Sequence, residues 1–169
     1  MKHLHLLRHA KSSWEDQSLP DEERPLAPRG TRASKRMAEH LAGRGLGVEL
    51  VVCSPARRAR ETLDPILDAC GWAAEVRVDP AVYGADAAQL LGVVQALPEE
   101  AASALVVGHN PGLQDLARRL ASEGAARGKL AKKYPTGALA SLELNAERWA
   151  EAGFGGGRLE SFVRPRDIG

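Results

Sequence analysis

The sequence predicts an α/β fold: a single domain over residues 1–169, with a mostly parallel central sheet and helices on both of its faces. Two observations lead to this prediction. The chain has 169 residues and a mass of 18.1 kDa, which is near the size of one domain and enough to bury one core. Along it, strand-like runs alternate with helical patterns, as they do in parallel sheets covered by helices.

The strand-like runs are short and bounded by turn residues. Four of them predict buried strands, three being largely apolar, at residues 3–7, 49–53, 75–78 and 104–107. Two later runs, 138–144 and 159–163, predict further strands. Pro165 follows the last run and favours an edge position for it.

Helical patterns fill the intervals between these runs. Apolar residues recur every three or four positions within residues 33–41, 59–67, 87–97 and 113–120. Ser54-Pro55 and Asn110-Pro111 predict the starts of two helices, because each puts a capping side chain before a proline at the first helical position. Pro65 lies inside the second pattern, so we expect that helix to kink or to begin again there.

Composition excludes several classes of protein. Hydrophobic residues at 44% and charged residues at 27% are typical of a folded globular chain. A net charge of +1 argues against general nucleic-acid or membrane-surface binding, and no apolar stretch approaches the roughly 18 residues of a membrane span. Two cysteines cannot form a disulfide framework or a four-ligand zinc site. We therefore expect a cytoplasmic protein without nucleic-acid or membrane partners.

Side chains suited to anion binding follow three of the predicted strands. Arg8 and His9 come after the first, Arg58 lies in the segment after the second, and His109 follows the fourth. In a parallel sheet the ligand crevice lies outside the carboxyl ends of the strands, so we expect these groups to converge. The two predicted helix starts add peptide N–H groups and positive dipole ends. The sequence therefore predicts a site for a phosphate or carboxylate group, with a phosphoryl group as the expected occupant.

Three motifs carry a resemblance to a known family. They are Leu6-Leu7-Arg8-His9-Ala10, Ser54-Pro55-x-x-Arg58-Ala59-x-x-Thr62 and Gly108-His109-Asn110-Pro111. In this order and spacing the chain resembles the histidine phosphatase superfamily, which has the phosphoglycerate mutase-like fold. Within that superfamily it is most similar to the SixA-type phosphohistidine phosphatases, through its short length and the runs Arg24-Pro25-Leu26-x-x-Arg29-Gly30 and Tyr134-Pro135-Thr136-Gly137-Ala138.

The resemblance implies a role for each site residue. His9 would be the nucleophile and form a phosphohistidine enzyme intermediate, while Arg8, Arg58 and His109 bind the phosphoryl oxygens, with no metal or cofactor. Phosphoryl transfer spreads negative charge over three equatorial oxygens and depends on in-line attack, so fixed positive donors suit it. With a reference pKa of about 6.5, a histidine beside guanidinium groups favours its neutral, nucleophilic form.

The sequence departs from the superfamily pattern near the predicted nucleophile. Ala10 stands where a glycine is usual. An alanine fits at this position as long as its backbone φ is not positive. Glu15 stands where mutase-like members carry a phosphate-binding asparagine. Ser12 or Ser13 is a candidate replacement, and Asn110 is a further candidate phosphate ligand.

The glutamate general acid of mutase-like members has no clear match in residues 79–84. Asp79 and Asp86 are candidate acids, although a strand-end turn and a helix cap are their more ordinary roles. A phosphate ester depends strongly on proton donation to its leaving group, whereas phosphohistidine leaves as an imidazole. We therefore expect a phosphohistidine-bearing protein as substrate and partner.

Alternative functions stay open. A small-molecule phosphomonoester phosphatase of the same superfamily would use the same pocket, as would a non-catalytic module that holds a phosphorylated partner. An intact Arg8-His9 pair favours an enzyme, and the short chain argues against a mutase. Cys53 lacks the arginine register of a cysteine phosphatase, and His3 and His5 lack a third metal ligand nearby in the sequence.

Two segments, 11–30 and 122–137, are longer than ordinary connections. Trp14 in the first is a candidate substrate contact. The second contains a basic cluster that would suit an acidic docking surface on a protein substrate, formed by Arg127, Lys129, Lys132 and Lys133.

Overall fold

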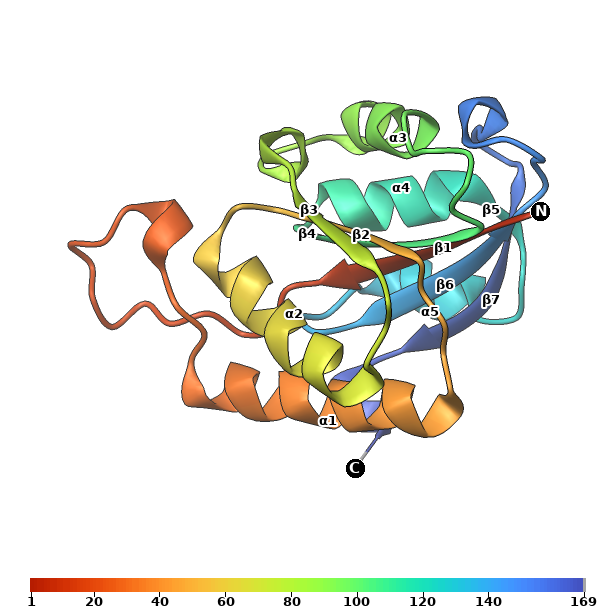
Figure 1. Cartoon of the computed structure of the whole chain (residues 1–169). Helices are drawn as coiled ribbons and strands as arrows, with labels where there is room; N and C mark the ends of the chain where they lie inside the picture. The colour runs from red at the N-terminus through yellow and green to blue at the C-terminus, as the bar shows by residue number, and fades with distance from the viewer. Residues whose placement is uncertain (169) are drawn as a thin grey trace.

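The central element is a seven-stranded sheet, seen in the computed structural model, which describes residues 1–168 (Figure 1). Its strand order is β3-β2-β4-β1-β6-β7-β5. The strands are β1 (Lys2–Arg8), β2 (Leu50–Cys53), β3 (Glu75–Val78), β4 (Ser103–Gly108), β5 (Ala121–Glu123), β6 (Leu139–Leu144) and β7 (Gly157–Val163). β6 is antiparallel to both of its neighbours, and the other pairings are parallel, so the predicted mostly parallel sheet is confirmed.

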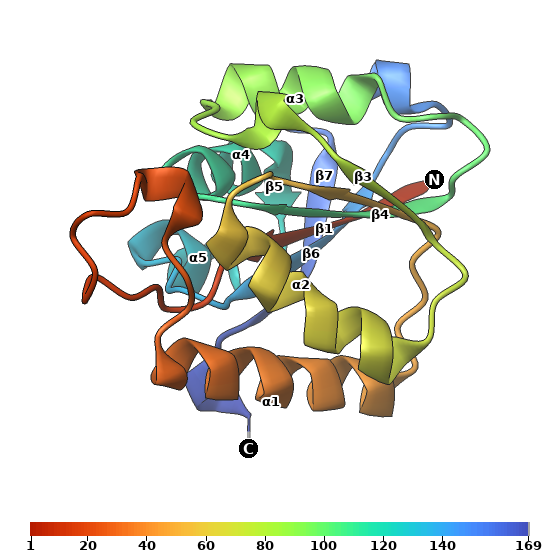
Figure 2. The same cartoon turned by 60° about the vertical axis from the view of Figure 1, so that its left-hand side comes forward.

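Helices cover both faces of this sheet, as predicted (Figure 2). One face carries α1 (Pro28–Arg44) and α2 (Arg57–Cys70), and the other carries α3 (Ala87–Gln95) and α4 (Gly112–Leu120). A short helix, α5 (Arg127–Lys132), packs against α4. Single 3-10 turns occur at η1 (Asp21–Glu23), η2 (Pro80–Val82), η3 (Trp149–Glu151) and η4 (Pro165–Asp167).

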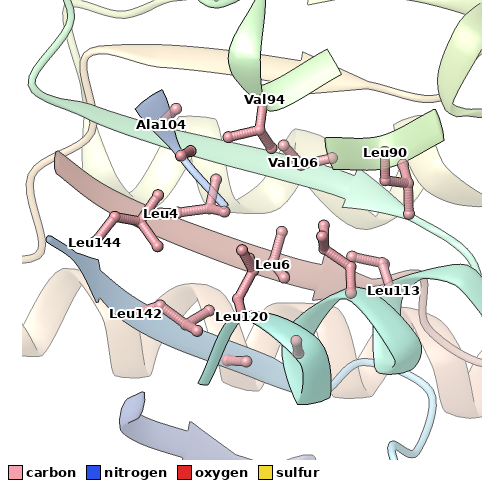
Figure 3. Packing of buried hydrophobic residues seen from close by; sticks show 14 of the residues in the cluster. Leu4, Leu6, Leu90, Val94, Ala104, Val106, Leu113, Leu120, Leu142 and Leu144 are labelled. Atoms are coloured by element: carbon pink, nitrogen blue, oxygen red, sulfur yellow. The ribbon is translucent and has the colours of Figure 1, made fainter. Parts of the chain in front are cut away.

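The alternation of side chains along β1 divides the core into two clusters. Leu4 and Leu6 point to the α3/α4 face and belong to one cluster with Leu90 and Leu113 (Figure 3). Leu7 belongs to the cluster under α1 and α2. Because β1 is buried on both faces between β4 and β6, the position of its carboxyl end is fixed by the whole sheet.

One strand prediction was wrong in detail. The run 75–78 is a strand, but it lies at the edge of the sheet and is exposed, with Val76 and Val78 at 42% and 53% exposure. The run 159–163 pairs with β6 along one side, and β5 pairs with β7 only at Gly157 and Arg158, so the other side of this run has no strand partner among the described residues, as predicted. β5 has only three residues, too few for a periodic pattern, and for this reason the sequence did not indicate it.

The predicted helix starts are displaced by one or two residues. α2 begins at Arg57, and the Ser54 hydroxyl accepts a hydrogen bond from the Ala56 N–H just before it. α4 begins at Gly112, and the Asn110 side chain accepts from the Gln114 N–H.

α2 also runs through Pro65 as one helix and does not begin again there. Leu63 and Ile66, on either side of this proline, are buried in the α1/α2 cluster. Their packing offsets the hydrogen bond that proline cannot donate.

The long segment after β1 is closed at its base by backbone hydrogen bonds. Ala27 N–H donates to Lys11 O at 2.9 Å, and Ser13 N–H donates to Pro25 O at 2.8 Å. Gly30, in the first turn of α1, lies against this closure: a Cβ at Gly30 would lie 2.1 Å from Lys11 O. The second long segment, 122–137, contains α5. No helix within residues 1–168 has the length and hydropathy to span a membrane.

Replacing Gly30 with alanine is expected to lower the free energy of unfolding by about 1–3 kcal/mol, because the new methyl group must displace backbone. Gly43, in the same helix, has no atom within 4 Å of its would-be Cβ, so G43A is a matched control. G43A is expected to raise stability by about 0.5–1 kcal/mol. Urea unfolding measures both changes, and equal effects in the two variants would contradict this account.

Candidate active site

The side chains that the sequence analysis placed at strand ends come together at one edge of the sheet. Arg8 is the last residue of β1 and pairs across the ladder with Gly108 of β4. His9 N–H donates to Gly108 O at 3.1 Å, and the rings of His9 and His109 lie 5.2 Å apart between centroids. Arg58 reaches the same edge from the first turn of α2.

A backbone hydrogen bond orients the His9 ring. His9 Nδ1 lies 2.7 Å from the carbonyl oxygen of Ala10. A carbonyl oxygen only accepts, so Nδ1 carries the hydrogen in this contact. In a neutral imidazole the lone pair is then on Nε2, which is the atom left for attack on an electrophile.

Thr62 fixes the backbone that makes this hydrogen bond. Its Oγ1 accepts from Ala10 N–H at 2.9 Å and donates to Arg58 O at 2.7 Å. One buried hydroxyl therefore joins the segment after β1 to the turn of α2 that carries Arg58. The spacing of Thr62 four residues after Arg58 places both on one face of the helix.

Burial keeps the His9 imidazole neutral. It lowers the pKa of His9 to about 3, and the positive charges of Arg58 and Arg8 and the nearby His109 act in the same direction. The hydrogen bond to Ala10 O opposes this shift by favouring the protonated ring, and burial outweighs it. At neutral pH His9 is therefore uncharged, as a nucleophile must be.

His109 is held by Ser54. Its Nε2 lies 2.8 Å from Ser54 Oγ, which also accepts from Ala56 N–H at 3.2 Å. In the tautomer in which the Ser54 hydroxyl donates to Nε2, the imidazole hydrogen of His109 lies on Nδ1. Burial, followed by the charge of Arg58, lowers the pKa of His109 to about 4, so this ring is also neutral.

Arg58 is anchored by an acidic residue that the sequence analysis missed. Its Nη1 and Nη2 donate to Asp21 O at 2.8 Å and to Asp21 Oδ2 at 3.0 Å. Tyr83 OH donates to the same carboxylate, and its ring packs edge-on to His109 at 5.5 Å. The Tyr83 hydrogen bond, with those from Arg58 and Arg24, lowers the pKa of Asp21 to about 2, so Asp21 is ionised.

Arg8 is anchored from the opposite side by Tyr134. Arg8 Nη1 donates to the Tyr134 carbonyl at 2.8 Å, and the fully buried Tyr134 hydroxyl donates to Leu6 O in β1. Gly137, at φ +77°, donates its N–H to His9 O at 3.0 Å. The segment 134–137 thus ties the end of β1 to the start of β6.

Three polar atoms of this cluster are buried without a hydrogen-bond partner among the described residues: Arg8 Nε, Arg58 Nε and His109 Nδ1. Buried donors without partners are rare, and each needs an explanation. These three residues gather with His9 at one sheet edge, since His109 is next to its ring and both arginines act on its pKa, and such a cluster is what a site for an oxyanion requires.

Ser12 and Asn110 have side chains already engaged by the scaffold. Ser12 Oγ accepts from Arg24 Nη1 at 2.8 Å. Asn110 donates to the Tyr134 carbonyl at 3.1 Å, and its carbonyl accepts from Gln114 N–H. In this structure both residues support neighbours of the site.

The other candidate residues lie in ordinary structural positions. Asp79 accepts from Ala81 N–H, and Asp86 caps α3. Cys53 is a buried strand residue, and burial raises the pKa of its thiol to about 12. Trp14 is 65% exposed and stacks on Arg24 at 3.5 Å.

No third metal ligand lies near His3 and His5 in the sequence, but strand pairing brings two carboxylates to His3. Ligand atoms of His3, Glu143 and Glu160 lie within 4.8 Å of one another. His5 instead pairs with Ser141 Oγ at 2.8 Å. This group lies at the opposite end of β1 from His9.

Comparison with known proteins identifies the class of protein that this fold and site define. Residues 4–112 match the Histidine phosphatase superfamily (branch 1), and the chain belongs to that family.

Comparison with individual proteins confirms the predicted resemblance of this chain to the SixA branch. Phosphohistidine phosphatase SixA of Escherichia coli is 30% identical over 142 residues, covering 83% of this chain and 84% of that protein. An uncharacterized protein of Mycobacterium tuberculosis is 35% identical over 164 residues, covering 95% and 100%. A SixA-type structure from Nakamurella multipartitia superposes with a TM-score of 0.83 at 31% identity, covering 97% of this chain and 96% of that one.

Replacing Thr62 with valine is expected to lower kcat by about tenfold, because the Ala10 backbone that orients His9 loses its hydrogen bond. The unsatisfied Ala10 N–H is expected to lower the free energy of unfolding by about 1–3 kcal/mol. T62S keeps the hydroxyl and is the control. Steady-state kinetics and urea unfolding measure both effects, and T62V and T62S with equal kcat would refute the positioning role of this hydroxyl.

Because the pKa of His9 is lowered to about 3, we expect its ring to titrate unusually in the folded protein. The ¹³Cε1 resonance of His9, assigned with an H9A variant, is expected to stay constant from pH 8 to pH 5. In the unfolded chain the same histidine protonates near its reference pKa of about 6.5, so the free energy of unfolding is expected to fall as the pH drops from 6.5 toward 4. A His9 midpoint near 6.5 in the folded protein would contradict this assignment.

Proposed function

We propose that this chain is a metal-independent phosphohistidine phosphatase, with His9 as its nucleophile. The observation that carries the proposal is a neutral His9, with its lone pair on Nε2, at the sheet edge where Arg8, Arg58 and His109 each have a buried nitrogen without a partner among the described residues. His109 and the two arginines provide fixed positive or polar donors for the three equatorial phosphoryl oxygens. The two guanidinium groups supply charge that a metal ion supplies in other phosphoryl-transfer sites.

The reaction proceeds in two displacements. His9 Nε2 attacks phosphorus, a P–N bond to His9 forms, and the P–N bond to the substrate imidazole breaks. The substrate imidazole, protonated on its other nitrogen, leaves as a neutral ring with the bonding electron pair on the released nitrogen. Water then attacks phosphorus, and the P–N bond to His9 breaks with its electron pair returning to Nε2. Phosphate leaves with the oxygen and both protons of the water, which restores the neutral ring with its hydrogen on Nδ1.

The carboxyl group of Asp21, which is bound to Arg58, favours phosphohistidine over a phosphate ester as the substrate. Asp21 is hydrogen-bonded to Arg58, and its pKa of about 2 makes it a poor proton donor at neutral pH. An alkoxide leaving group depends on such a donor, whereas an imidazole leaves readily once its other nitrogen is protonated. The likeness to the Escherichia coli phosphohistidine phosphatase SixA supports the same substrate class.

A substrate panel with EDTA present tests this proposal. It compares a phosphohistidine-bearing protein, free phosphohistidine, a sugar phosphate and an aryl phosphate. We expect kcat/KM to be highest for the P–N substrates, and H9A to lower it by at least about 10³-fold. Preference for the sugar or aryl phosphate would favour a small-molecule phosphomonoesterase, and phosphate binding without turnover would favour a binding module.

A further inference from the structure

A basic groove begins beside the candidate active site. It has a volume of about 910 Å³ and is lined by eight Lys and Arg side chains from four separate segments. Arg29 and Arg36 come from one face of α1, Arg164 and Arg166 come from the segment after β7, and the rest are Lys11, Lys129, Lys132 and Lys133. In Figure 2 the segment that leaves β1 passes between α5 and the start of α1.

The charge of this groove is concentrated and largely unpaired. Eight of the 23 Lys and Arg residues of the chain line it, and no Asp or Glu is among the lining residues. Within residues 1–168, only Arg164 of these eight has a carboxylate within 4.0 Å, that of Asp167. Because the whole chain has a net charge of +1, the rest of the molecule is net acidic. Such a charge separation steers an anionic partner toward one face.

The groove adjoins the site through the backbone that holds it. Lys11 follows Ala10, whose carbonyl orients His9. Pro135 and Thr136 line the groove and directly follow Tyr134, whose carbonyl anchors Arg8. The groove and the candidate site therefore share the backbone segments that follow β1 and precede β6.

We propose that this groove docks a carboxylate-rich surface of the phosphohistidine-bearing protein substrate, an inference that rests on the proposed function. A protein suits the groove better than a nucleic acid does, because no aromatic residue lines it, and single-stranded nucleic acids are bound by stacking bases on aromatic rings. The rings of Pro135 and Pro165 and the methyl group of Ala33 add apolar surface for side chains of a folded partner.

Two synthetic phosphohistidine peptides test the docking role. They differ only in the residues around the phosphohistidine, glutamate in one and glutamine in the other, and free phosphohistidine is the small substrate. The variant K129Q/K132Q/K133Q removes three charges from the groove. The variant K35Q/R118Q/R158Q removes three exposed charges that do not line it and is the charge-matched control.

We expect the native protein to prefer the glutamate peptide by about tenfold in kcat/KM at low salt, and the preference to shrink as salt is added. The groove variant is expected to lose most of this preference, and the control variant to keep it. The ratio between the glutamate peptide and free phosphohistidine should fall in the same way. An absent preference, or an equal loss in both triple variants, would overturn the docking role.

Binding of the unphosphorylated peptides, measured by fluorescence anisotropy, separates this inference from the proposed function. Tighter binding of the glutamate peptide that weakens in the groove variant supports docking even if no phosphohistidine is hydrolysed. Hydrolysis of free phosphohistidine without any peptide discrimination overturns docking and leaves the phosphatase proposal intact. Tighter binding of a single-stranded oligonucleotide than of the glutamate peptide would overturn the choice of a protein partner.

Discussion

The proposed attack of His9 on a phosphoryl group requires the lone pair of Nε2 to face the anion site, and one 2.7 Å hydrogen bond from Nδ1 to the Ala10 carbonyl orients the ring. The rest of the site is arranged around this contact. β1 places His9 at the centre of the sheet edge, and Thr62 holds the Ala10 peptide against α2. A small shift in this peptide would turn the lone pair away from the phosphorus, and catalysis is sensitive to such misplacement.

Electrostatics at this edge combine two opposite requirements. In the proposed mechanism a phosphoryl group needs positive charge, which Arg8 and Arg58 would provide, while the attacking His9 ring must itself stay neutral. Burial makes these two requirements compatible, because it strongly disfavours a protonated imidazole. The guanidinium groups have a much higher reference pKa and remain charged. Asp21 and the Tyr134 carbonyl hold the outer ends of the two guanidinium groups.

Much of the fold and part of the site follow from local sequence patterns. His9 and His109 stand directly after apolar strands, so the parallel sheet alone predicts that they meet. No local sequence pattern marks Asp21 or Tyr83, because their contacts with Arg58 and His109 depend on how the segment after β1 folds back over the sheet edge. The exposure of Val78 likewise depends on strand order, which is a property of the whole sheet and not of the run 75–78.

The role of the His9–Ala10 hydrogen bond is tested most directly by the position of the phosphoryl group on the trapped enzyme. Rapid quenching at alkaline pH, followed by peptide mapping and ³¹P NMR, identifies both the modified histidine and the nitrogen that carries phosphorus. We expect phosphorylation of His9 at Nε2, since Nδ1 is engaged by the Ala10 carbonyl. Phosphorus on Nδ1 of His9, or on a different histidine, would contradict it.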